Sequence, residues 1–411
     1  MAADRKQSRD LSLDRQGAVF ERVKIVPARW SALAAACGIG FASSANYTNH
    51  APMVTSLAAE FGFKLAAAGL LTTGVFLTHG GMQIPGGYLA DRWGSKPVLS
   101  IALAIVCLGN IALGLATGYW QLLSWKIFVG LGTGTCFVAG ARYIAGMFAG
   151  PRLHLAQGFY GGSVLLGSGF VIFAVPLLLA AVGWRGAFFC TAALAAVAAV
   201  VWILLAPQPP ALDHKPVPLA EMLSNPQLWL LGLGQMASFG LVIVVGVWVT
   251  AYLSKSFSAP LTEAGRIGSL VLVMGIASRP LGGALVPRLG ARRTLQTGLL
   301  LNAAACLNFG LGSGSLARAG SGLLLLGLGC GLPYAAVFNR AGALYPARAG
   351  AAMGLVNMLG IAMILAAPPL VGQMVEWSGS FQSSFLALGG FTLLAWLAAF
   401  RIHPNESHQP V

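Results

Sequence analysis

The chain alternates between long apolar runs and short polar segments. A membrane-spanning helix needs about 20 mostly apolar residues, and twelve runs reach that length. They lie at 30–57, 66–89, 98–117, 119–148, 153–182, 186–206, 228–254, 263–287, 293–313, 316–345, 351–375 and 382–401. The pattern predicts an all-α integral membrane protein with twelve transmembrane helices.

One internal polar segment is much longer than the others. It reads "APQPPALDHKPVPLAEMLSNPQ" from Ala206 to Gln227, and its prolines disfavour a helix. This segment divides the apolar runs six and six. We therefore predict five parts: a tail over 1–29, a six-helix bundle over 30–206, a loop over 207–227, a second bundle over 228–401 and a tail over 402–411.

The composition supports a membrane location. Of the 411 residues, 57% are hydrophobic and only 9% are charged, whereas a soluble domain carries about 25% charged residues. The six cysteines all fall inside apolar runs without a Cys-x-x-Cys pair, so we expect no metal site and no disulfide framework. The chain has no phosphate-binding loop of the form GxxxxGK(S/T), and we expect no cofactor.

The basic residues predict the orientation. Most of the 25 lysines and arginines lie in segments on the same side as the N-terminus, and cytoplasmic loops are enriched in these residues. We therefore place both termini in the cytoplasm, with the chain in the plasma (inner) membrane. Topology also explains most of the net charge of +14, and no basic face points to nucleic acid. The basic tail either acts only as this topology signal or also contacts anionic lipid.

Three short stretches recur about 196 residues apart. "FGFKLAAAG" at 61–69 matches "FSAPLTEAG" at 257–265, "GGYLADRWGSK" at 86–96 matches "GGALVPRLGAR" at 282–292, and "GLGTG" at 130–134 matches "GLGCG" at 327–331. A nearly constant offset indicates a parallel duplication of two six-helix halves. Many secondary transporters have this arrangement, with a binding site between the repeats.

The stretch "GGYLADRWGSKP" lies between two apolar runs and contains three charged residues. It resembles the signature loop of the major facilitator superfamily, Gly-x-x-x-Asp-Arg-x-Gly-x-Lys/Arg. The matching positions are Gly87, Asp91, Arg92, Gly94 and Lys96, and the second copy keeps Gly283, Arg288, Gly290 and Arg292 while Pro287 replaces the acid. The resemblance implies two pseudo-symmetric six-helix bundles and a contact between them on the cytoplasmic face. The alternative is a charged turn that only ends a helix.

Four basic residues and no Asp or Glu fall inside the predicted spans. These are Lys126, Arg142, Arg279 and Arg340. A charge at membrane depth costs at least ~2.5–3.5 kcal/mol, so it points to function. A positive interior favours an anionic substrate, because a cation transporter would be expected to bury a carboxylate.

Arg279 is the main candidate for substrate binding, because it lies in the middle of a span and its planar guanidinium suits oxyanions. At the repeat offset its counterpart is Gln83, and His79 shares a helix face with Gln83. We expect these three side chains to converge from the two halves. The alternatives are that Arg279 binds backbone carbonyls near Pro280 and that His79 is a packed neutral side chain.

The other three basic residues each allow more than one role. Lys126 begins "KIFVGLGTG", where many members of the superfamily carry Arg; it either binds substrate or extends to the outer membrane surface. Arg142 and Arg340 lie near cytoplasmic helix ends, where we favour a gate contact, with Arg142 pairing Asp91, or extension to the surface over the alternative of substrate binding. Four polar residues either line the cavity or join helices: Asn46, Tyr47, Tyr334 and Asn357.

The predicted function is secondary active transport of a small inorganic or organic anion by alternating access, with a proton or an exchanged anion as a possible coupling partner. Stretches such as "YTNHAPMVTSLAAEFG" are similar to nitrate/nitrite and cyanate porters and to organic-anion porters of the superfamily, although those nitrate porters carry Arg at the position of Gln83. The resemblance also implies a monomer. The main alternative is a drug or metabolite exporter, and a distant one is a membrane sensor. We find no nucleophile–base pair in the sequence, so we do not expect an enzyme.

Overall fold

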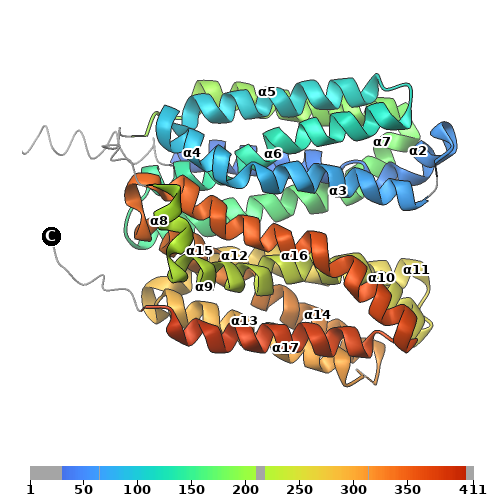
Figure 1. Cartoon of the computed structure of the whole chain (residues 1–411). Coiled ribbons are helices and arrows are strands. Elements are labelled where there is room, and N and C mark those ends of the chain that lie inside the picture. Colours follow the sequence, from blue (N-terminus) through green and yellow to red (C-terminus); the bar gives the residue numbers. More distant parts are fainter. Residues whose placement is uncertain (1–29, 64, 210–217, 313, 404–411) are drawn as a thin grey trace, which may run out of the picture.

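The computed structural model describes residues 30–63, 65–209, 218–312 and 314–403. Within these ranges the chain is almost entirely helical, as the apolar runs predict. Figure 1 shows two groups of helices side by side, with the first half of the chain (blue to green) along one side and the second half (yellow to red) along the other.

The first half begins with a helix over residues 30–48. It continues with η1 (Ala51–Met53), α2 (Val54–Phe61), α3 (Leu65–Gly81), α4 (Gln83–Trp93), α5 (Ser95–Gly114), α6 (Tyr119–Met147) and α7 (Pro151–Leu205). Within the 55 residues of α7, Gly183 has φ 69° and ψ 178°, which only glycine adopts readily, so two spans meet there. This break falls between the two predicted runs 153–182 and 186–206.

The second half is divided into more segments. It contains α8 (Leu219–Ser224), α9 (Pro226–Gln235), the π-helical segment η2 (Met236–Gly240), α10 (Leu241–Phe257), α11 (Leu261–Gly268), α12 (Leu270–Leu289), α13 (Ala291–Gly310), α14 (Leu316–Gly331), α15 (Pro333–Leu344), η3 (Pro346–Arg348), α16 (Ala349–Ser378), α17 (Gln382–Ala398) and η4 (Ala399–Arg401).

Eight helical segments of the described residues are long and apolar enough to span a membrane by themselves. Dividing α7 at Gly183 adds one span. The helix over 30–48, the pair α3 and α4, and α13 complete the twelve predicted spans. The predicted bounds of the two bundles stay predictions, but the linker needs one correction. Its segment α8 is helical, because its six residues lie between Pro218 and Pro226 and contain no proline.

The duplication reappears in the backbone. Gly94 has φ 85° and ψ 150°, and Gly290, 196 residues later, has φ 81° and ψ 157°. Both glycines lie between two spans, α4–α5 and α12–α13, where they allow the chain to turn sharply. Gly62 (φ 66°) and Ser258 (φ 53°) form a second left-handed pair at the same offset. The two halves therefore share turn geometry as well as sequence.

The halves meet along two pairs of helices. α4 packs along α16, and α12 packs along α7. Buried apolar residues from both halves form a shared core at the end where α4 finishes, which we call the Asp91 end. A second shared core lies further along the bundle and includes Val75, Phe239 and Ile361. Figure 1 places α8 at the Asp91 end and α2 and α11 at the opposite end. The interface between the halves is therefore packed at two levels.

Candidate functional site

At the Asp91 end, a carboxylate of the first half caps a helix of the second. Asp91 Oδ1 accepts hydrogen bonds from Arg142 Nε at 2.7 Å and from the Gly350 amide at 3.1 Å, and Oδ2 accepts one from the Ala351 amide at 3.1 Å. The two amides belong to the first turn of α16, where a helix favours negative charge. The structure thus forms the predicted Asp91–Arg142 pair and extends it across the interface.

Two glycines allow the halves to approach at this end. A methyl group on Gly87 would lie 2.7 Å from the Ala351 nitrogen, and one on Gly283 would lie 2.8 Å from the His154 carbonyl carbon. Both contacts are with backbone, which cannot rotate away. Gly87 and Gly283 are repeat counterparts, so α4–α16 and α12–α7 use the same close packing. We call Gly87, Asp91, Arg142 and Gly283 the latch.

Five of the remaining residues proposed for the gate are basic, and Gly94, the sixth, forms the α4–α5 turn described above. Lys96 Nζ donates to the Ala206 carbonyl at 2.7 Å, within the first half. Arg340 Nη2 donates to the His403 carbonyl at 3.4 Å, within the second. Arg92 and Arg288 are exposed and Arg292 is half-buried. A gate role for these five residues stays a prediction.

Arg279 lies between the halves and is 1% exposed. Its Nη1 donates to the carbonyl of Gly161 on α7, and its guanidinium carbon lies 4.5 Å from the Tyr334 ring centroid and 5.8 Å from that of Phe239. Its Nε is buried without a hydrogen-bond partner. One alternative was that Arg279 binds backbone carbonyls near Pro280. The structure agrees in part, because Arg279 binds the carbonyl of Gly161, and the next residue, Gly162, packs against Pro280.

An aromatic cluster connects Arg279 with the first half. Phe137 of α6 lies with its ring centroid 6.4 Å from both Phe239 and Tyr334, and 6.2 Å from the ring of His79. His79 also meets Tyr47 at 5.4 Å. The aromatic cluster (Tyr47, His79, Phe137, Phe239, Tyr334) brings together three of the side chains predicted for the site, and Arg279 borders it.

Gln83 lies on the opposite pair of interface helices. Its Nε2 donates to the carbonyl of His79 at 3.0 Å, and its Oε1 is buried without a partner. A methyl group on Gly354 of α16 would lie 2.6 Å from the Gln83 carbonyl carbon. On the same helix, Asn357 accepts from Gln235 Nε2 at 2.9 Å and keeps its own Nδ2 unpaired. These groups offer neutral hydrogen bonds, because neither amide carries a charge.

Lys126 is buried within the first half. Its Nζ donates to Asn49 Oδ1 at 2.5 Å and to the Asn46 carbonyl at 3.2 Å, and it lies 5.7 Å from the Phe188 ring centroid. Asn49 donates in turn to Asn110 and Thr191. Of the two alternatives for Lys126, extension to the membrane surface is wrong, because this network holds the side chain at 0% exposure. Substrate binding by Lys126 and Asn46 stays a prediction.

Several residues of this region were not predicted from sequence. Phe137 and Phe239 are ordinary members of apolar runs, so nothing marked them. Gln157 is fully buried on α7, and neither atom of its amide has a hydrogen-bond partner among the described residues. A lone Gln in an apolar run was the available signal. The described residues hold no group of three His, Cys, Asp or Glu side chains that could bind a metal.

The comparison with protein families decides the identity. The sequence model described as "Major Facilitator Superfamily" matches residues 36–360 and 233–411. The chain belongs to the major facilitator superfamily. The resemblance read from the signature loop is thereby confirmed, and so is the fold that it implied.

Similar proteins cover most of the chain. A "Probable nitrate/nitrite antiporter NarK1" of Thermus thermophilus is 26% identical over 362 residues, covering 80% of this chain and 81% of its own. A "Probable sulfoacetate transporter SauU" of Cupriavidus necator is 25% identical over 401 residues, covering 89% and 91%. Among solved structures, the proton:xylose symporter XylE superposes with a TM-score of 0.79 at 15% identity, covering 92% and 97%. The human organic anion transporter MFSD10 gives 0.74 at 18%, covering 90% and 99%.

A separate ion pair lies at the end opposite the latch. Glu60 Oε1 accepts from Arg185 Nη1 at 2.7 Å, and Oε2 accepts from the Trp184 indole. These donors, with the indole contributing most, lower the pKa of the Glu60 carboxyl below its ordinary 4.5. The pair joins the segment after the first span to the sixth span, so it belongs to the first half alone.

Proposed function

We propose that this chain carries a small monovalent anion across the plasma membrane by alternating access, with Arg279 as the counter-ion of the substrate. The proposal rests mainly on the environment of Arg279. This cation is buried at the interface of the halves, it has no carboxylate partner among the described residues, and its Nε has no hydrogen-bond partner. An isolated buried charge is costly, and a bound anion would offset that cost.

The neighbours of Arg279 support a single negative charge on the substrate. Arg142 is already paired with Asp91, and Lys126 is held by Asn49 in the interior of the first half. The repeat counterpart of Arg279 is the neutral Gln83. One fixed cation beside aromatic rings suits an oxyanion of charge −1, because a second negative charge would lack a counter-ion.

The names of two relatives that cover most of the chain support an anionic substrate, although not its charge. They are a nitrate/nitrite antiporter and a transporter of sulfoacetate, which is a dianion at neutral pH. We therefore favour anion transport over a drug or metabolite exporter. The coupling partner in this proposal is a proton or an exchanged anion.

The latch supplies the conformational part of the proposal. Asp91 and the two close glycine contacts hold one end shut, and we assign that end to the cytoplasm from the distribution of basic residues. Opening it requires Asp91 to leave the Gly350 and Ala351 amides. Alternating access then exchanges this closure for one at the opposite end while the anion stays beside Arg279.

The test is ligand-dependent thermal stability of the purified full-length protein. The panel contains nitrate, nitrite, cyanate, small monocarboxylates and sulfonates, dicarboxylates and lipophilic cations. A ligand at 100 times its Kd stabilises the native state by about 2.7 kcal/mol. We expect a shift with monovalent anions that is lost in Arg279→Gln, weakened in Arg279→Lys and kept in the matched control Arg288→Gln, an exposed Arg on the same helix.

Two results would contradict the proposal. One is an unchanged anion affinity in Arg279→Gln, and the other is a shift produced only by lipophilic cations. The unliganded melting temperature of each variant shows whether it is folded. Uptake into proteoliposomes with an imposed pH gradient or with internal anion then separates proton coupling from exchange.

A further inference from the structure

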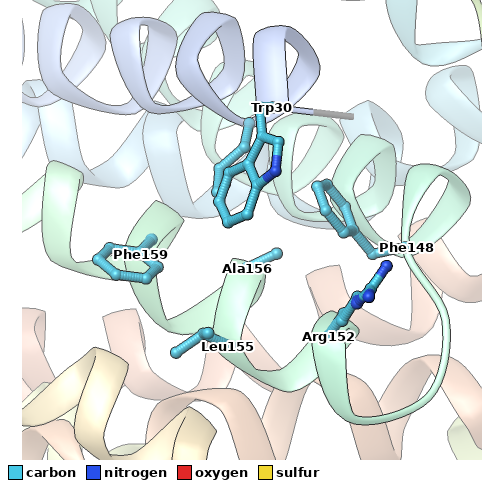
Figure 2. Close-up of a pocket in the computed structure, with 7 residues that line it drawn as sticks. Trp30, Phe148, Arg152, Leu155, Ala156 and Phe159 are labelled. Carbon is cyan, nitrogen blue, oxygen red and sulfur yellow. The ribbon is translucent and has the colours of Figure 1, made fainter. Parts of the chain in front are cut away.

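A groove outside the proposed substrate site opens between the helix over 30–48 and the start of α7. It has a volume of about 250 Å³ and is lined by Trp30, Leu33, Phe148, Arg152, Leu155, Ala156 and Phe159. Figure 2 shows Trp30 reaching into the groove from one helix and Arg152 at the end near Phe148. We call it the Trp30–Arg152 groove.

The groove walls face the surroundings of the bundle. Trp30 is 60% exposed and Phe159 is 44% exposed, whereas Leu33 and Ala156 at the base are buried. In a membrane protein, exposed aromatic side chains on the outside of a span meet lipid. A Trp at the end of a span is typical of the boundary between hydrocarbon and headgroups. The groove therefore starts at the headgroup level and extends toward the apolar region.

Arg152 is the one charged residue of the lining. It is exposed, and among the described residues it has no hydrogen-bond, ion-pair or ring partner. It is also the second residue of α7, whose N-terminal end carries partial positive charge. The polar end of the groove is therefore positive, and no acidic side chain lines it.

The second half does not repeat this arrangement. The counterpart of Arg152 at the repeat offset is Arg348, directly before α16, and its guanidinium carbon lies 4.6 Å from the Tyr88 ring centroid. Arg348 therefore has a partner within the protein. Arg152 is left available at the same position of the first half, so a ligand site here would be particular to one half.

We propose that the Trp30–Arg152 groove binds one membrane phospholipid with an anionic headgroup. The lipid phosphate pairs with Arg152, and an acyl chain lies against the apolar wall formed by Leu33, Leu155 and Phe159. Two observations support this assignment: the charge of Arg152 is complementary to that of the lipid phosphate, and the lining has both a polar and an apolar part. It is independent of which solute the transporter carries.

The test uses the full-length protein in nanodiscs and the fluorescence of Trp30. Brominated phosphatidylglycerol or brominated phosphatidylcholine is titrated as the quencher, and subtracting the signal of Trp30→Phe isolates Trp30 from the other nine tryptophans. An attraction of about 1 kcal/mol per Arg corresponds to about fivefold. We expect half-maximal quenching at an about fivefold lower mole fraction of the anionic lipid.

Variants make the result specific to the groove. Arg152→Gln should remove the preference for phosphatidylglycerol while quenching by phosphatidylcholine continues, and Arg92→Gln, an exposed Arg outside the lining, should keep it. Native mass spectrometry should detect one retained phosphatidylglycerol in the wild type and none in Arg152→Gln.

Three outcomes overturn the proposal. The first is equal quenching by the two lipids in the wild type. The second is an equal loss of preference in Arg152→Gln and Arg92→Gln, which would indicate general surface charge. The third is quenching that appears only after deletion of residues 1–28, which would mean that the chain's own N-terminal segment fills the groove.

Discussion

The substitution Asp91→Asn separates two roles of one carboxylate. Its bond from Arg142 lies within the first half, so it contributes to the stability of that half in every conformation. Its bonds from the Gly350 and Ala351 amides cross to the second half, so they exist only when the Asp91 end is closed. Removing the charge should therefore shift the conformational equilibrium as well as the stability.

The geometry gives the size of that shift. Asparagine keeps one oxygen and presents an NH₂ group to the second amide, so one crossing hydrogen bond is lost and the other loses its charge. Hydrogen bonds to charged groups contribute about 1.5–3 kcal/mol, and a charge at a helix N-terminus adds about 0.3–1 kcal/mol. The closed state should lose about 2–4 kcal/mol, or roughly 30- to 1,000-fold in the closed-to-open ratio.

Hydrogen exchange measures this ratio directly. The peptide that covers the first turn of α16 contains both amides, and in Asp91→Asn we expect its exchange to be at least about 30-fold faster. Anion binding should change little, because Arg279 is untouched, while transport slows. Arg293→Gln, at an exposed basic residue outside the predicted gate, is the control. Exchange at the wild-type rate, or an equal acceleration in the control, would refute the reasoning.

Two further substitutions test the packing and the second ion pair. Gly283→Ala places a methyl group 2.8 Å from the His154 carbonyl carbon, so transport should fall at least about tenfold while anion binding persists; Gly81→Ala, whose methyl group meets nothing within 4 Å, should transport normally. Equal rates would show that the contact is not needed for closure. Glu60→Gln should lower the melting temperature near neutral pH. Because the pKa of Glu60 is lowered from 4.5, its stabilisation is present above pH 4.5 and is lost as the pH falls through the lowered pKa. The two melting curves should therefore converge in acid, and a difference that persists there would contradict an ionic origin.

The features read correctly from the sequence are those that local chemistry dictates. Apolar runs of spanning length and the repeat offset follow from neighbouring residues along the chain. The Asp91–Arg142 pair was also accessible, because a buried acid and a buried base near the same end of their spans have few other partners.

The side-chain partners inside the bundle could not be read in this way. Helical periodicity says which residues share a face but not which helix that face meets. The position of Lys126 two turns from a span end suggested contact with the surface, whereas three asparagines and a threonine from other spans provide it with a buried network. Phe137 and Phe239 join the site only through packing between α6 and η2, which is a tertiary property.

The latch is unequal on its two sides. Asp91 fastens α4 to α16, but its counterpart at the repeat offset is Pro287, so α12 meets α7 without a carboxylate at that position. Across that half of the interface, the neutral pair His154 and Asn339 lies at 2.9 Å instead. Opening this end must therefore break a charged contact between α4 and α16. On the α7–α12 flank, the described residues require only the separation of close backbone packing and neutral hydrogen-bonding groups, so removal of a single charge acts on one flank alone.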